Sequence, residues 1–155
     1  MGREVKCAFC ELKVDKDESI RYKGKNYHAQ CYYEFKEKER LVTYICELFS
    51  LKAPGPRNYR SIKKYIEENN YTYKGILNSL KYFYEVKKGN KEKANSGIGI
   101  VPYIYDEAQE YYERLKYKNK KIRKVVENQK EIEDKKIKII IPKKVQRKKY
   151  DIEEL

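Results

Sequence analysis

The pattern of apolar and polar positions predicts a chain that is mostly helical after residue 28. Apolar side chains recur every three or four positions in residues 29–51, 59–70 and 73–88, as they do in helices that bury one face. The prolines and the glycine of "LKAPGPRN", residues 51–58, end the first of these helices. A core built from three helices is therefore expected in the middle of the chain.

The segment after the third helix predicts a change of structure. Residues 89–97, "GNKEKANSG", form a polar loop, and residues 98–105, "IGIVPYIY", are expected to form a strand. A long charged helix is expected from Asp106 onward. Residues that recur at alternating steps of three and four positions share one face of this helix and form a mostly apolar seam. They are Ala108, Tyr111, Leu115, Lys118, Ile122, Val125, Gln129 and Ile132. Such a seam either packs on its own domain or pairs with a second copy of the chain, as a homodimer through residues 108–132.

The N-terminal window contains the side chains that bind metals. Two residues separate Cys7 from Cys10, and two separate His28, the only histidine, from Cys31. Zinc prefers a tetrahedron of thiolate sulfur and imidazole nitrogen, and His28 and Cys31 share one face in the first turn of a helix. We therefore expect one structural zinc ion bound by Cys7, Cys10, His28 and Cys31, because four protein ligands leave no open position for water.

Two other interpretations of the cysteines remain open. A CxxC pair is also typical of redox dithiols, and all four cysteines can instead be free thiols beside an incidental histidine. The second pair, at zinc-finger spacing, favours the metal site. Cys46 lies within "LVTYICELF" and is expected to be a small buried thiol in the core.

The elements expected around these ligands resemble a treble-clef zinc finger. Residues 11–14 and 19–28 are typical of short strands, Gly24 supplies a turn, and the helix follows His28. The spacing C-x2-C-x17-H-x2-C is similar to the first half of a LIM domain over about residues 5–35. A complete LIM domain is excluded because no second set of ligands follows. So small a module buries little surface, and metal binding is expected to supply its folding energy.

The middle of the chain resembles a winged helix-turn-helix and, loosely, small replication or regulatory proteins of phages of Gram-positive bacteria. In that arrangement residues 73–88 enter the major groove and the loop after them is a basic wing. The resemblance implies nucleic-acid contacts from Lys74, Asn78, Ser79, Lys81, Tyr82, Lys91 and Lys93. A helical domain without direct DNA contacts is the alternative.

The formal net charge of +13 lies mostly in the C-terminal third. Residues 114–149 contain 16 basic and four acidic residues, whereas residues 1–113 contain 21 and 17. A block of one charge usually meets nucleic acid or stays solvated. Phosphate contacts are expected from Lys120, Lys121, Arg123 and Lys124.

The sequence shows none of the common catalytic motifs, such as a P-loop, GxGxxG, GxSxG or HExxH, and its only histidine is assigned to zinc. Enzyme activity is therefore not expected. We expect a zinc-finger protein that binds nucleic acid, DNA before RNA, in phage or mobile-element replication or transcription control. The alternative is a non-enzymatic adaptor or inhibitor that binds a host protein. A cytoplasmic location, in the host if a phage encodes the chain, is expected because neither a membrane span nor a secretion signal is visible.

The expected fold is α+β, mostly α. It consists of an N-terminal treble-clef zinc finger, a helical and winged-helix-like domain, a long C-terminal amphipathic helix with a short extended segment, and a flexible tail. The corresponding boundaries are residues 1–35, 36–105, 106–142 and 143–155.

Overall fold

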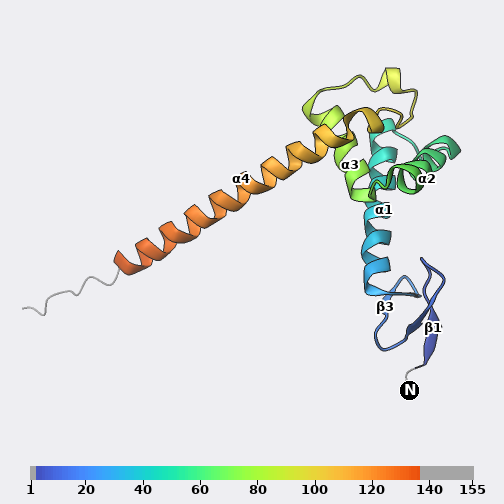
Figure 1. Ribbon diagram of the computed structural model, residues 1–155, viewed down its shortest axis with the longest axis horizontal. Coiled ribbons are helices and arrows are strands. Elements are labelled where there is room, and N and C mark those ends of the chain that lie inside the picture. Colours follow the sequence, from blue (N-terminus) through green and yellow to red (C-terminus); the bar gives the residue numbers. More distant parts are fainter. Residues whose placement is uncertain (1–2, 137–155) are drawn as a thin grey trace, which may run out of the picture. The chain divides into compact units, whose positions relative to one another are not determined.

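The computed structural model describes residues 3–136, and their side chains as far as residue 132. Within these residues two small antiparallel sheets precede four α-helices and two short helical turns, so the fold is α+β and mostly α (Figure 1). The chain divides into two compact units, residues 1–114 and 115–155. The extended segment and tail predicted after residue 136 lie outside the described residues.

Two hairpins build the N-terminal module. Strand β1, Glu4–Lys6, pairs with β2, Lys13–Asp15, and strand β3, Ile20–Tyr22, pairs with β4, Lys25–Tyr27. The turn between β3 and β4 confirms the role predicted for Gly24, whose φ of 76° is in the left-handed region that glycine tolerates best. The sequence pattern did not predict β1.

The three predicted helices are present, with the predicted break between the first two. Helix α1 spans Ala29–Phe49, α2 spans Pro56–Asn69 and α3 spans Tyr73–Lys81. Pro56 opens α2, where its missing N–H costs nothing, and the Thr72 hydroxyl caps α3 by accepting from the Gly75 N–H at 3.0 Å.

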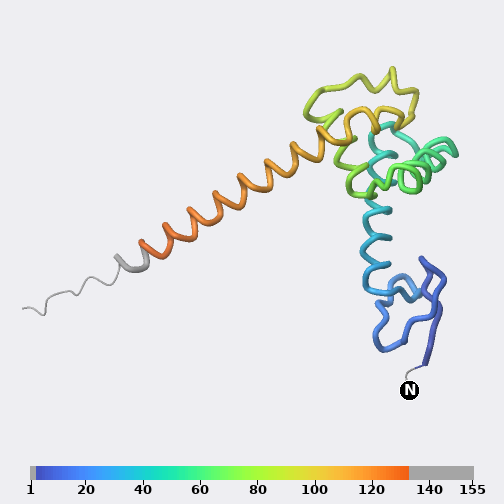
Figure 2. The backbone as a smooth tube through the Cα atoms, in the orientation of Figure 1, coloured from blue at the N-terminus to red at the C-terminus, as the bar shows by residue number. Residues whose placement is uncertain are grey.

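Helix α1 connects the module to the helical core. Figure 2 shows it as one continuous helix that begins beside the hairpins and ends among the other helices. Its Leu41 and Ile45 are fully buried against Ile76 and Leu80 of α3. A second, smaller cluster of buried residues lies under the hairpins around Tyr27.

The prediction of a strand over residues 98–105 is wrong. Helix α4 spans Val101–Lys136 and therefore begins before Asp106, the predicted start. Val101, Ile104 and Ala108 are all buried, and their spacing places them on one helical face. Pro102 fits the first turn, where helices tolerate proline.

The predicted β wing is therefore not formed, since no strand occurs between residues 28 and 136 of the described chain. The third helix is also shorter than predicted. It ends at Lys81 and gives way to a π-helical turn, η1, Tyr82–Val86. The loop that follows contains one 3-10 turn, η2, Glu92–Ala94. The winged-helix resemblance is not supported.

Candidate metal centre and basic surfaces

The four predicted metal ligands converge. One donor atom from each of Cys7, Cys10, His28 and Cys31 lies within 4.8 Å of all the others. The distance to His28 Nδ1 is 3.3 Å from Cys10 Sγ and 3.7 Å from Cys31 Sγ. Zinc bond lengths in a tetrahedron place sulfur and nitrogen about 3.6 Å apart. The cluster is therefore compatible with a zinc site.

Local structure brings the two pairs together. Cys7 directly follows β1 and begins a tight turn, in which its N–H donates to the Leu12 carbonyl at 2.8 Å and its carbonyl accepts from the Glu11 N–H at 3.0 Å. The Ala8 N–H donates to the Asn26 carbonyl at 2.9 Å, which ties this turn to β4. Strand β4 then delivers His28 to the N-terminus of α1, so that Cys31 follows in the first turn.

A hydrogen bond to the backbone orients the histidine. His28 Nε2 lies 3.1 Å from the Lys13 carbonyl oxygen, to which it donates. The other nitrogen, Nδ1, is then the unprotonated one and faces the sulfurs. Metal-bound histidines usually donate their distal N–H to a carbonyl or carboxylate in this way. The sequence pattern did not single out Lys13, because any residue supplies a backbone carbonyl.

Burial and hydrogen bonds shift the pKa values of two of the clustered thiols in opposite directions. Burial opposes ionisation of Cys7, but the backbone N–H groups of Cys10, Phe9 and His28 lower its pKa to about 6. Burial and the neighbouring sulfurs of Cys10 and Cys7 raise the pKa of Cys31 to about 12. Three thiolates at such distances repel one another, and a divalent cation reverses that repulsion.

Cys46 is separate from this cluster. It lies near the end of α1, is half-buried rather than fully buried, and is a free thiol. Its position outside the Cys/His cluster agrees with the prediction that it is not a ligand, whereas the predicted burial in the core is not found, because Cys46 does not belong to the buried cluster around Leu41 and Ile45.

Two residues predicted to contact nucleic acid are buried. The Ser79 hydroxyl donates to the Gly75 carbonyl at 2.9 Å, and its side chain is fully buried. Tyr82 is only 7% exposed, packs on Tyr111 and donates to Glu107 at 2.6 Å. The prediction failed for both because the first turns of α4 cover this face of α3 and η1.

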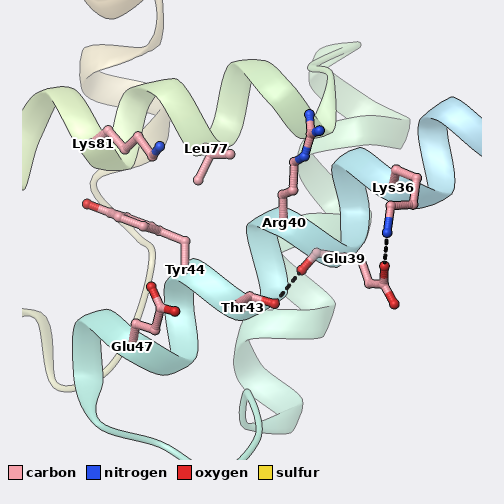
Figure 3. Close-up of a pocket in the computed structure, with 8 residues that line it drawn as sticks. All are labelled: Lys36, Glu39, Arg40, Thr43, Tyr44, Glu47, Leu77 and Lys81. Carbon is pink, nitrogen blue, oxygen red and sulfur yellow. Dashed lines mark hydrogen bonds and ion pairs between the residues drawn. The ribbon is translucent and has the colours of Figure 1, made fainter.

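The other residues predicted on α3 differ in exposure. Lys74 is exposed and Asn78 is half-buried. Lys81 is half-buried in a groove between α1 and α3, where its Nζ lies 5.6 Å from the ring centre of Tyr44 (Figure 3). The groove contains both signs of charge, and Lys36 pairs with Glu39 across 2.8 Å. Because these opposite charges offset one another, the groove is not a strong site for an anion.

The loop after η1 carries the remaining predicted lysines of the middle domain. Lys91 and Lys93 are exposed, and neither forms an ion pair with a described residue. Lys93 shares a cleft with Arg57 and Tyr103, which the sequence pattern did not indicate. No local signal connects those three residues, since the fold alone brings them together.

The basic residues predicted on α4 are all exposed. Residues 115–132 carry seven basic and two acidic side chains, and every one of these charged groups is exposed. Lys120, Lys121, Arg123 and Lys124 belong to this set. Apolar residues of the seam are exposed too, including Leu115 at 39%, Ile122 at 58% and Ile132 at 52%. None of the described helices has the length and apolar character that crossing a membrane requires.

Comparison with known proteins places the chain in a phage family. The model of the SPbeta prophage protein YorH family matches residues 7–154. The SPbeta prophage-derived uncharacterized protein YorH of Bacillus subtilis (strain 168) is 40% identical over 153 residues, which cover 96% of this chain and 95% of that protein. No solved structure matches the chain. With a family match over nearly its whole length, the chain belongs to the SPbeta prophage YorH family.

Proposed function

We propose that the protein binds nucleic acid and is not an enzyme, and that it acts in phage replication or transcription control in the host cytoplasm. The observation that carries the proposal is the exposed basic stretch of α4, residues 115–132. Lysine and arginine bind phosphate through charge, and such contacts release counterions from the nucleic acid. A single helix fits the major groove of duplex DNA, which makes DNA the first expected partner.

The absence of ion pairs between this stretch and other described residues supports the binding of an external partner. None of its seven basic residues has an acidic side chain within ion-pair distance among the described residues. Like charges at neighbouring positions on one helix repel one another, and Lys121 alone among them contacts an aromatic ring of the described chain, that of Tyr117 at 4.7 Å. A polyanion would relieve that repulsion.

The N-terminal module supports a structural role for zinc. We propose that residues 1–35 form a treble-clef zinc finger in which Cys7, Cys10, His28 and Cys31 hold one Zn²⁺. The donor set, its separations and the oriented imidazole fit that ion. Zinc would neutralise the thiolates and fix the two hairpins to α1.

One observation favours the second candidate, an adaptor or inhibitor that binds a host protein. Leu115, Ile122, Val125 and Ile132 are exposed and recur at heptad spacing on the same helix. An apolar seam is suited to a partner helix, whether from a host protein or from a second copy of the chain. The seam does not explain the basic residues around it, so nucleic acid remains the first proposal.

A salt titration with a matched charge control tests the proposal. The test variant replaces Lys120, Lys121, Arg123 and Lys124 by glutamine. The control makes the same replacement at four exposed basic residues of the other unit, Lys16, Arg21, Lys25 and Lys52.

Both variants are titrated with a duplex of random sequence at several salt concentrations. The α4 variant should bind more weakly, and the slope of log K against log salt should flatten by roughly 0.9 per lost phosphate contact. The control should keep the wild-type slope. If the wild type binds no nucleic acid at moderate salt and instead retains one host protein after nuclease treatment, the adaptor hypothesis replaces this one.

A further inference from the structure

A cleft of about 310 Å³ lies beside the loop that follows η1. Its walls include Arg57 from the first turn of α2, Phe83 and Tyr84 from η1, Lys93 from η2, and Tyr103 from the first turn of α4. Gly99 forms part of the rim. The volume is at the lower end of the range for small-ligand sites, which suits a ligand of one nucleotide.

Positive charge at the cleft is uncompensated. Arg57 and Lys93 come from separate elements, and neither pairs with a carboxylate in the part of the chain that the structure describes. Gly97 lies beside Arg57, since a Cβ there would be in van der Waals contact with the guanidinium carbon at 3.6 Å. Two cations held at one small cleft are suited to a phosphate.

Aromatic surface lies beside these cations. Tyr103 is 84% exposed, the most exposed of the large apolar side chains described. Its ring belongs to neither hydrophobic cluster of the described residues. Phe83 is half-buried and forms another wall. Tyr84 is 94% buried, and its hydroxyl has no hydrogen-bond partner. An exposed ring next to two cations is the usual composition of a site for an unpaired base and its phosphate.

We propose that this cleft binds one unstacked nucleotide of a single-stranded nucleic acid, and this proposal rests on the nucleic-acid binding proposed above. The base stacks on Tyr103, and the phosphate lies between Arg57 and Lys93. A base within a duplex is stacked on both faces and does not enter such a cleft. The cleft therefore gives the protein a preference for single strands, whereas the basic stretch of α4 contacts the phosphates of either form.

The test uses two variants that alter the cleft in opposite ways. Tyr103→Ala removes the stacking ring. Gly99→Leu fills the cleft, and it is compatible with the fold because a Cβ at Gly99 meets no atom within 4 Å and its φ is an ordinary one. The matched control is Gly55→Leu, since Gly55 also faces open space but does not line the cleft.

Each protein is titrated by fluorescence anisotropy with three labelled probes of about 20 nucleotides or base pairs, a length that exceeds the site size of most single-strand modules. The probes are oligothymidylate, an abasic strand of the same length, and a duplex. The wild type should bind oligothymidylate more tightly than the abasic strand. Both cleft variants should weaken oligothymidylate binding by at least about fivefold, the low end for loss of one stacked base. They should leave binding of the abasic strand and the duplex unchanged, and Gly55→Leu should alter none of the three.

The outcomes separate the two proposals. If the wild type binds oligothymidylate and the abasic strand equally, or if the cleft variants keep wild-type affinity for oligothymidylate, the cleft proposal is wrong and binding through α4 stands. If the wild type binds none of the three probes, both proposals are wrong.

Discussion

Loss of one metal ligand should unfold the N-terminal module and leave the helical core intact. The perturbation is Cys31→Ser, which replaces a sulfur donor in the first turn of α1 by a weaker ligand. Residues 4–27 should then lose their fixed structure. Residues 41–49 of α1 should keep theirs, because their buried side chains belong to the separate cluster shared with α3.

The expected size of the effect follows from how little the module buries. Val14 and Tyr27 are its buried apolar side chains, beside the ligand Cys7. Each such side chain contributes about 1.5–3 kcal/mol. A structural zinc ion contributes about 10–16 kcal/mol in small zinc-finger modules. A zinc ion bound here would therefore be the larger source of stability, and we expect the two hairpins not to persist without it.

Hydrogen exchange read by mass spectrometry measures both regions in one experiment, and elemental analysis gives the zinc content. In Cys31→Ser we expect less than one zinc per chain and loss of protection across residues 4–27. Cys46→Ser is the matched control, since Cys46 lies on the same helix outside the cluster. The control should keep both its zinc and the protection of residues 4–27. The reasoning is refuted if fresh wild-type protein contains no zinc, or if removing zinc leaves that protection unchanged.

Three further predictions concern the helical part of the chain. Gly75→Ala places a Cβ against the ring of Tyr105. The free energy of unfolding in urea should therefore fall by about 1–3 kcal/mol. An unchanged urea midpoint would contradict the tight contact. The Lys87 ammonium is the main group that holds the pKa of Glu107 below its ordinary value, so Lys87→Gln should raise that pKa in carboxyl carbon NMR. Because the folded-state pKa is the depressed one, this stabilisation is complete above the unfolded pKa of about 4.3 and is lost as pH falls through the folded value. If the α4 seam pairs two chains, Ile122→Glu should sediment as a folded monomer, and a wild type that is already monomeric at high micromolar concentration would refute the pairing.

The Cys/His cluster could be predicted because its geometry is local. Each ligand pair lies within one tight turn or one helical turn, and two short hairpins bring the pairs together. Residue type and spacing therefore determine most of the site. The hydrogen bond from His28 to the Lys13 carbonyl could not be predicted, because a backbone carbonyl leaves no trace in residue type.

The error over residues 98–105 has a different origin. In so short an apolar segment, periods of two and of 3.6 residues are hard to tell apart. Tertiary packing decides the outcome, because a helix allows Val101, Ile104 and Ala108 to face the core together. The same packing explains why the exposure of α3 was wrongly predicted. Which face of a helix is buried depends on a later segment, and here that segment is the start of α4.

The distribution of ion pairs separates the charges that serve the fold from those available to a partner. On α1, Glu39 accepts from Lys36 at 2.8 Å and from Lys23 of the β3–β4 turn at 2.9 Å, and these two lysines lower its pKa to about 2. That contact ties a hairpin to the helix. Residues 115–132 instead place seven basic groups on one helix with two acidic ones, where mutual repulsion opposes helix formation. Apart from Lys121, whose ammonium lies 4.7 Å from the centre of the Tyr117 ring, these basic groups have no stabilising contact that the described chain supplies, so a bound anion would relieve their repulsion. It follows that binding of a polyanion should increase the helical content of this stretch, and that the increase should diminish as added salt screens the charges.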